Sequence, residues 1–404
     1  MSNLKNIFSG TVIVTGLGYF VDIYDMLIFN MTRVASLTEL GLSGEAVTQT
    51  GIFILNLQMV GLLVGGIVWG MLSDRVGRKA CLFASILIYS LGTLACGFVQ
   101  DADTYAVLRL ICGFGLAGEV GVGATLITEK LSADQRGLGV GLFAAMGIFG
   151  AVGAGIMIEL VDWRTAYIVG GICGLLLLLA RAKIMESGIY EKMDRGGAPV
   201  GNLLVIFRNP ACRRKYIAGI LIGVPIYFAV SIVWTLAPEI ARAMGVAEPL
   251  KPHIVISIGY LAMTISGFAT ALISERLKSR KRTVLICQIL GLAALPVLLF
   301  MPAPTATGYY VMTAVIGLGA GYWTIMITLG AEQFGTNIRA TASTTISNFV
   351  RAATIPMTLA FSALKADGAV MATLVIGLVV YAIAIVAVHW LEETYGKDLD
   401  YLER

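Results

Sequence analysis

Residues 70–79 read Gly-Met-Leu-Ser-Asp-Arg-Val-Gly-Arg-Lys, and this charged stretch separates two long apolar runs. Its centre, Ser73-Asp74-Arg75, returns as Ser274-Glu275-Arg276, which is 201 residues later in the chain. The second copy also follows one apolar run and leads into another. A repeat of this length predicts that each half of the chain is built on the same plan.

A second signature supports the same repeat. Glu129 is followed seven residues later by Arg136, and the pair returns as Glu332 and Arg339 with an offset of 203. Half of the 404 residues is 202, so the two offsets agree with two copies of one unit joined head to tail. Apolar halves repeated in parallel are typical of membrane transporters.

The composition places this chain in a bilayer. It is 57% hydrophobic and 13% charged, with a mean hydropathy of +0.84, whereas soluble domains carry about 25% charged residues. The 28 residues between Glu45 and Asp74 contain no charge, and a helix needs about 20 apolar residues to cross the hydrocarbon core. Because topology accounts for the basic residues, the net charge of +4 does not indicate a nucleic-acid partner.

The apolar runs predict an all-α membrane protein with twelve transmembrane helices in two six-helix halves. We expect an N-terminal bundle at 1–182, a cytoplasmic linker at 183–215, and a C-terminal bundle with a cytoplasmic tail at 216–404. The expected spans are 9–31, 48–72, 80–99, 105–128, 138–158, 165–182, 216–240, 253–273, 283–301, 308–331, 341–364 and 368–391.

The basic residues predict the orientation of these spans. If both termini are cytoplasmic, 22 of the 29 Lys and Arg lie on the inner side. Five lie outside, among them Arg33 and Arg164, and two, Arg109 and Arg351, lie within spans. This asymmetry follows the positive-inside rule. We therefore expect a protein of the bacterial inner (plasma) membrane with both termini in the cytoplasm.

The stretch 70–79 resembles the G-x-L-x-D-R-x-G-R-K signature of the major facilitator superfamily, and in the second copy Lys278 replaces the central glycine. Arg109 with Gly113 and Gly115 is similar to the R-x-x-x-G-x-G element of its sugar-porter branch. The resemblance implies two pseudo-symmetric six-helix bundles with a cavity at the midplane between them.

Independently of the resemblance, Asp74 and Arg78 lie where a helix enters the cytoplasm, and charge contacts there can form in one conformation and break in another. We therefore expect the charged residues of the repeated signatures to act as a gate; the alternative is that they only mark the topology. The gating set is Asp74, Arg75, Arg78, Glu129, Arg136, Glu275, Glu332 and Arg339.

Four ionisable residues inside the first-half spans are candidates for proton coupling, because a charge within a membrane is costly and usually functional. Asp22 and Asp25 lie three residues apart on one face of the first span, and Arg109 and Glu119 lie in the fourth. If an acid of the first span pairs with Arg109, protonation of that acid releases the arginine and can drive transport. The alternative is a fixed ion pair that only ties the helices together.

Substrate contacts are expected from both halves. The arginine of the eleventh span resembles the anion-binding arginine of mammalian organic-ion transporters, and Asp22-Ile23-Tyr24-Asp25 resembles the D-G-x-D of aromatic-acid:proton symporters. A buried guanidinium requires a carboxylate neighbour or a bound anion. Tyr322 lies 203 residues after Glu119, at the equivalent position. The expected substrate-binding set is Tyr24, Glu119, Tyr322, Asn348 and Arg351.

These patterns favour secondary active transport by alternating access, as proton-coupled symport of a small organic anion (carboxylate). The alternatives are a transporter of a neutral or zwitterionic, sugar-like metabolite and a proton-driven exporter of drugs or metabolites. No nucleotide-binding, metalloprotease or hydrolase motif appears in the sequence, so we do not expect an enzyme, a cofactor or a bound metal. The expected partners are a small-molecule substrate, protons and the lipid bilayer, with no nucleic acid, and we expect a monomer.

Overall fold

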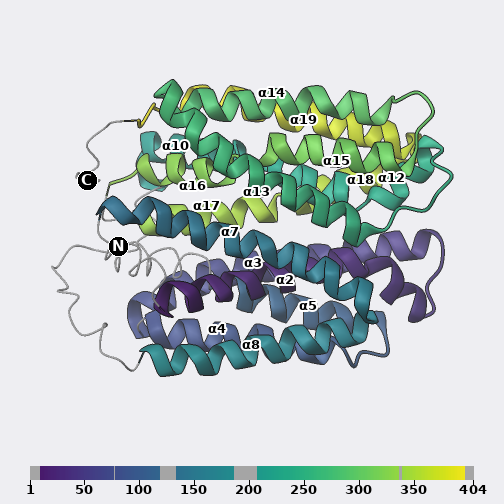
Figure 1. Ribbon diagram of the computed structural model, residues 1–404, viewed down its shortest axis with the longest axis horizontal. Helices are drawn as coiled ribbons and strands as arrows, with labels where there is room; N and C mark the ends of the chain where they lie inside the picture. The colour runs from purple at the N-terminus through teal and green to yellow at the C-terminus, as the bar shows by residue number, and fades with distance from the viewer. Residues whose placement is uncertain (1–9, 77, 119–132, 186–206, 336–338, 396–404) are drawn as a thin grey trace. The chain divides into compact units, whose positions relative to one another are not determined.

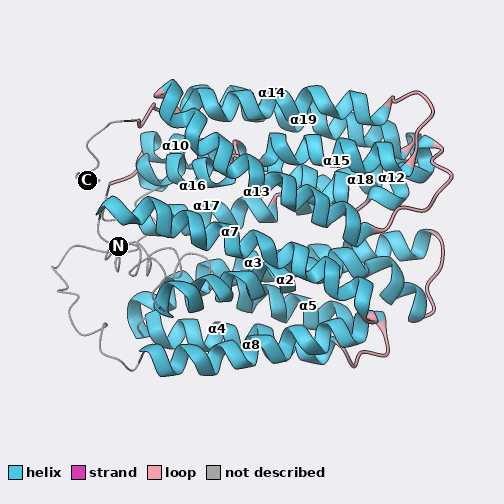
Figure 2. Ribbon diagram, viewed as in Figure 1, coloured by secondary structure: helices cyan, strands magenta, loops and turns pink. Residues whose placement is uncertain are grey.

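The computed structural model describes residues 10–76, 78–118, 133–185, 207–335 and 339–395. Every regular element among these residues is a helix (Figure 2). The chain divides into two compact units, Met1–Gly201 and Asn202–Arg404. In Figure 1 the colour runs from purple to teal along the first unit and from green to yellow along the second.

The first unit contains six described helices. They are α2 (Gly10–Glu39), α3 (Glu45–Val76), α4 (Arg78–Cys96), α5 (Ala102–Leu116), α7 (Ala133–Leu160) and α8 (Trp163–Met185). In Figure 1 the long helices of this unit run roughly along one direction, as expected for apolar helices that pack side by side. The main packing partners are α2 with α7, α3 with α5, and α4 with α8.

The second unit is built from helices that are more often interrupted. Its elements are α10 (Pro210–Leu221), α11 (Val224–Phe228), η1 (Ala229–Trp234), α12 (Ala237–Met244), α13 (Pro252–Leu277), α14 (Arg280–Leu299), α15 (Ala306–Ala320), α16 (Trp323–Glu332), α17 (Arg339–Ala352), α18 (Thr354–Leu364), η2 (Lys365–Asp367) and α19 (Ala369–Trp390). The element η1 is a π-helical turn, a feature often found at functional positions of helices.

Within the described ranges, eight helical stretches are long and apolar enough to cross a membrane. They are Val12–Glu39, Glu45–Trp69, Trp163–Arg181, Pro210–Trp234, Pro252–Leu277, Arg280–Leu299, Ala306–Gly330 and Ala369–Trp390. Two shorter apolar helices, Ala80–Cys96 and Ala145–Leu160, overlap the third and fifth expected spans. The all-helical fold with candidate membrane spans is thereby confirmed for the described residues, and the full count of twelve stays a prediction.

Glycines bring α3 and α5 into direct backbone contact. A Cβ atom on Gly61 would lie 2.1 Å from the backbone oxygen of Leu110, and one on Gly113 would lie 2.1 Å from that of Gln58. Only hydrogen fits at these two positions, as is common where membrane helices pack closely. This packing fixes α5, which carries Arg109, firmly against its neighbour.

Helices α5 and α15 are counterparts in the two units. They begin at Ala102 and Ala306, an offset of 204, and a side-chain oxygen of Asp101 or Thr305 accepts a hydrogen bond from the backbone N–H three residues later. Each helix is followed by a turn, at 117–118 and at 321–322. The structure therefore preserves the sequence repeat in the positions of helix starts and breaks.

Neighbouring side chains satisfy the carbonyls that these breaks expose. The indole Nε1 of Trp69 donates to the Phe114 carbonyl at 2.7 Å, and the Ser266 hydroxyl donates to the Leu318 carbonyl at 2.6 Å. A free carbonyl within a membrane is costly, so interrupted helices persist only where such donors are present.

The expected end of the first span was wrong in detail. The first span was expected to end at residue 31, but α2 continues to Glu39 and encloses Arg33, which is 1% exposed and not in an outer loop. The expected linker, 183–215, overlaps the end of α8 and the first six residues of α10. Its bounds and its cytoplasmic location stay predictions.

Candidate functional site

The first unit contains a buried ion pair between α2 and α5. Nη1 of Arg109 donates to Oδ1 of Asp25 at 2.9 Å, and Nη2 donates to the Asp25 backbone oxygen at 2.8 Å. The two side chains are 0% and 1% exposed. The sequence had suggested that an acid of the first span pairs with this arginine, and the structure brings Asp25 and Arg109 together.

Burial makes this pair sensitive to the loss of either charge. Removing one partner of a buried ion pair typically costs about 3–5 kcal/mol, because the remaining charge stays in a low-dielectric surrounding. Protonation of Asp25 has the same electrostatic consequence as a mutation that neutralises it. Binding of a single proton therefore changes the net charge of this buried pair.

Three further residues were expected to take part in coupling or substrate contact in the first unit. Asp22 is 0% exposed and lies one turn before Asp25 on α2. The hydroxyl of Tyr24 donates to the Ala166 carbonyl of α8 at 2.8 Å, so it is engaged within its own unit. Glu119, expected in both the coupling and the substrate-binding sets, lies outside the described residues.

In the second unit, one expected substrate contact, Tyr322, follows α15, and the other two, Asn348 and Arg351, lie on α17. Tyr322 is fully buried, and its hydroxyl donates to the Ile222 carbonyl at 2.8 Å, so it ties the break after α15 to the break after α10. Asn348 and Arg351 lie one turn apart on α17 and are 3% and 1% exposed. Together with Thr345 and Ser347 they give α17 a buried polar face.

Arg351 lies where α17 is interrupted. It is in the last turn of α17, and α18 begins at Thr354. The hydroxyl groups of Thr354 and Ser231 are 2.5 Å apart, which joins this break to the π-helical turn η1. The buried guanidinium thus lies one turn from a contact between two irregular helix segments.

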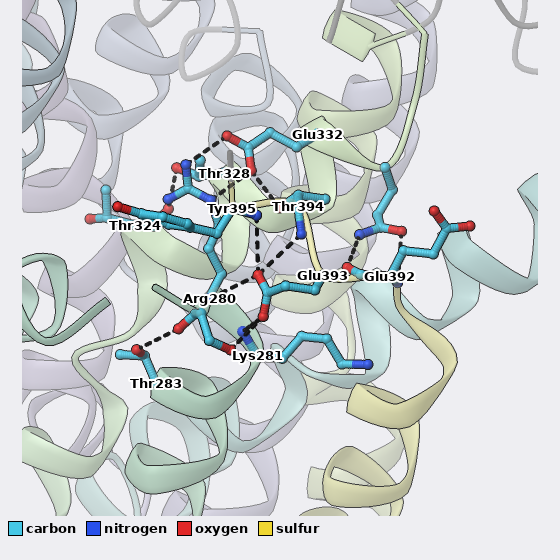
Figure 3. Close-up of polar contacts among 12 residues, drawn as sticks. Arg280, Lys281, Thr283, Thr324, Thr328, Glu332, Glu392, Glu393, Thr394 and Tyr395 are labelled. Carbon is cyan, nitrogen blue, oxygen red and sulfur yellow. Dashed lines mark hydrogen bonds and ion pairs between the residues drawn. The ribbon is translucent and has the colours of Figure 1, made fainter. Parts of the chain in front are cut away.

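Part of the expected gating set forms a polar cluster at one end of the second unit, shown in Figure 3. Nη2 of Arg280 donates to Oε1 of Glu332 at 2.8 Å, and its Nε lies 2.7 Å from Oε2. The Thr394 hydroxyl donates to the same carboxylate at 2.6 Å. Tyr395 donates from its hydroxyl to Oε2 of Glu275 at 2.9 Å. Three segments far apart in sequence meet here: the junction of α13 and α14, the end of α16, and the residues that follow α19.

Glu393 closes this cluster by accepting hydrogen bonds at the start of α14. Its carboxylate accepts from the backbone N–H groups of Arg280 at 3.0 Å and Lys281 at 3.3 Å, and from the hydroxyl of Ser279. Burial acts to raise the pKa of Glu393, but these hydrogen bonds outweigh it and the pKa is lowered. The carboxylate therefore stays ionised at neutral pH, and its contribution is lost only as the pH falls below the usual range of a glutamate.

Several gating candidates cannot be placed. The backbone of Asp74, Arg75, Arg78, Arg136 and Arg339 is helical, but their side chains lie outside the described part, as does all of Glu129. Arg280 and Glu393 were not among the site residues predicted from the sequence. The repeat could have pointed to Arg280 as the counterpart of Arg78, because α4 begins at Arg78 and α14 at Arg280, an offset of 202.

The degenerate position of the second signature has a conformational basis. Lys278, which replaces the central glycine of the first copy, has φ 47° and ends α13 in the left-handed conformation. Glycine reaches this conformation without the steric penalty of a Cβ atom. Lysine therefore performs at residue 278 the helix-ending role for which glycine is the usual residue.

We expect Glu332→Gln to lower the stability of the protein by about 1.5–3 kcal/mol, the range for hydrogen bonds to a charged group. The substitution keeps the shape of the side chain but removes the charge that holds Arg280. The matched control is Glu392→Gln, since Glu392 is 55% exposed and pairs with Lys215 at 3.1 Å; surface pairs contribute about 0–1 kcal/mol. Equal melting temperatures for the two purified variants would contradict this role for the cluster.

Comparison with known proteins identifies the family. The family model described as Major Facilitator Superfamily matches residues 15–358. The chain is 26% identical to the niacin transporter of Acinetobacter baylyi over 96% of this chain and 94% of the relative. It is 26% identical to a probable 4-methylmuconolactone transporter of Cupriavidus pinatubonensis, over 95% and 90%, and 24% identical to the gentisate transporter of Corynebacterium glutamicum, over 80% and 73%.

Proposed function

This chain belongs to the Major Facilitator Superfamily, and we propose that it is a proton-coupled symporter of a small organic carboxylate, working by alternating access. Relatives along most of the chain are named as transporters, and no catalytic activity is indicated for them. We place it in the bacterial inner membrane as a monomer with twelve spans and cytoplasmic termini, on the strength of the apolar runs and the basic residues.

The observation that carries the coupling proposal is the buried pair of Asp25 and Arg109. A carboxylate that is 1% exposed and bonded to an arginine changes the net charge of the interior when it binds a proton. Such a change can favour one conformation over another only through a difference in free energy between them. Loss of a buried ion pair supplies a difference of sufficient size.

Two observations support a carboxylate as the substrate. Arg351 provides a buried guanidinium, whose planar fork matches a carboxylate in two parallel hydrogen bonds. In addition, relatives are named for the transport of niacin and gentisate, both of which are aromatic carboxylates. Since the hydroxyls of Tyr24 and Tyr322 are engaged with backbone carbonyls, we assign direct contact with the carboxylate to Arg351 and Asn348.

A ligand screen followed by transport tests this proposal. Purified protein is heated with aromatic carboxylates, sugars, amino acids and amines, and we expect stabilisation by carboxylates such as nicotinate or gentisate. A ligand present at about 100 times its Kd stabilises a folded protein by about 2.7 kcal/mol. The stabilising compound is then offered to proteoliposomes with an inward proton gradient, with a protonophore as the control.

The outcomes separate the possible functions. Accumulation of a carboxylate that the protonophore abolishes supports symport. Stabilisation by sugars or zwitterions alone would contradict the carboxylate proposal. Accumulation that requires an outward proton gradient would instead identify a proton-driven exporter.

A further inference from the structure

Arg109 contacts an aromatic ring as well as Asp25. The guanidinium carbon Cζ lies over the ring of Tyr167 in α8, 5.7 Å from the ring centroid. Tyr167 is 0% exposed, as is Arg109. A cation within about 6 Å of an aromatic face is attracted to the ring, and more strongly so when both are removed from water.

The ring of Tyr167 is held in place from two sides. Its hydroxyl accepts a hydrogen bond of 2.6 Å from the hydroxyl of Tyr105, which lies one turn before Arg109 on α5. Tyr105 and Trp163 also pack edge-on against the ring, with centroids 5.8 and 6.2 Å away. The face presented to Arg109 is therefore fixed before any proton arrives.

The attraction of the ring is expected to be stronger when Asp25 is protonated, because the ionised carboxylate no longer holds the guanidinium 5.7 Å from the ring centroid and the cation can move closer to the ring face. When Asp25 is protonated, Arg109 loses its negative partner, and a buried cation without compensation is strongly unfavourable. The face of Tyr167 remains available in that state. It therefore lowers the free energy of the protonated form by more than it lowers that of the ionised form.

We propose that Tyr167 is a positioning residue that stabilises the guanidinium of Arg109 when Asp25 is protonated, and that it thereby sets the pH range in which transport is coupled to protons. This inference rests on the proposed function, because it assumes that Asp25 binds the coupled proton. Tyr105 takes part indirectly, by fixing the orientation of the ring.

Several other titratable groups lie around Arg109. The titratable groups that act on it are Asp25 of α2, Tyr167 of α8, Cys96 of α4 and Cys112 of α5, and Tyr105 also acts on it. Asp22 lies one turn from Asp25, and α3 contributes the uncharged Gln58, whose amide donates to the Met26 carbonyl. Thiols and phenols carry no charge at neutral pH. The aspartates are therefore the only negative charges among the groups named here.

The test is the pH profile of substrate accumulation in proteoliposomes. Tyr167→Leu removes the ring, so the protonated form is less stable and a higher proton concentration is needed. We expect the midpoint of the profile to move by about one pH unit toward acid, which corresponds to a tenfold change in proton concentration. Tyr167→Phe keeps the aromatic face and is expected to move the midpoint by less than half as much.

A fluorinated series separates electrostatics from packing. Phenylalanine analogues with one, two and three ring fluorines at residue 167 weaken the negative face stepwise at nearly constant size. We expect the midpoint to move further toward acid with each fluorine, while the KM for exchange at saturating proton concentration stays constant. If Tyr167→Leu does not fold, this series still tests whether the negative face of the ring sets the midpoint of the pH profile.

The control is Tyr309→Leu. Tyr309 is the counterpart of Tyr105 in α15, is fully buried, and donates its hydroxyl to the Val233 carbonyl at 2.7 Å. This control is expected to leave the midpoint unchanged, even if it lowers stability. A midpoint that does not respond to fluorination would overturn the proposal for Tyr167. By contrast, proton-driven accumulation that survives in Asp25→Asn would overturn the proposed function itself.

Discussion

Asp25→Asn is expected to abolish proton-driven accumulation of substrate while exchange of substrate across the membrane continues. Asparagine cannot bind a proton in the physiological range, so net uptake no longer draws on the proton gradient. Exchange needs no net movement of protons, and its rate is expected to fall by less than tenfold. Radiolabelled uptake and counterflow in the same proteoliposomes measure the two activities.

The amide keeps part of the local structure. Its oxygen can still accept a hydrogen bond from Arg109, in the place where Oδ1 of Asp25 accepts one at 2.9 Å. The charge is lost, and this mimics the protonated state in a permanent form. We therefore expect the variant to fold, with a lower melting temperature than the wild type because the guanidinium is left without its negative partner.

A matched control is Asp101→Asn. Asp101 lies at the start of α5, where its carboxylate accepts from the backbone N–H and the hydroxyl of Thr104 at 2.7 and 2.9 Å. These hydrogen bonds lower the pKa of Asp101, and asparagine serves about equally well at a helix start. Accumulation should be unaffected. If Asp25→Asn accumulates substrate as well as this control does, the ion pair only ties α2 to α5.

Arg351→Ala is expected to weaken the binding of the carboxylate substrate by at least about 1.5 kcal/mol, the low end for hydrogen bonds to a charged group. This corresponds to a dissociation constant more than tenfold higher. Arg351→Lys should restore the affinity only in part, because an ammonium cannot form the two parallel hydrogen bonds of a guanidinium. Isothermal titration with the stabilising carboxylate measures both variants.

The control in the same unit is Arg242→Ala, at an exposed position of α12, which should leave the affinity unchanged. The same variants also test whether the site selects for the charge of the substrate. An uncharged amide analogue of the substrate should bind weakly to the wild type and lose little further affinity in Arg351→Ala. An Arg351→Ala protein that binds the carboxylate as tightly as the wild type would point to a neutral ligand.

The apolar runs predicted most of the helical fold, because a membrane helix needs a continuous apolar stretch that is visible in one sequence. The ends of the helices were less predictable. Hydropathy alone places the end of the first span before Arg33, yet α2 continues past this residue to Glu39. The polar segment α17 gives a weak apolar signal, although Asn348 and Arg351 on it are buried.

Pairing between helices was predictable only where unusual residue types met. Asp25 and Arg109 stand out because ionisable residues are rare in apolar spans, and their attraction suggested a partner. The ring of Tyr167 gave no such signal, since an aromatic residue in a span normally reads as packing or as lipid contact. Glu393 was equally hidden: its role comes from the start of α14, more than a hundred residues away in sequence.

The most direct test of this account is the movement of protons with substrate. Proteoliposomes that enclose a pH-sensitive dye receive the stabilising carboxylate on the outside, with no initial pH gradient. We expect acidification of the interior by the wild-type protein, none by Asp25→Asn, and normal acidification by Asp101→Asn. Acidification by Asp25→Asn at the wild-type rate, or substrate entry into wild-type vesicles without any proton movement, would contradict it.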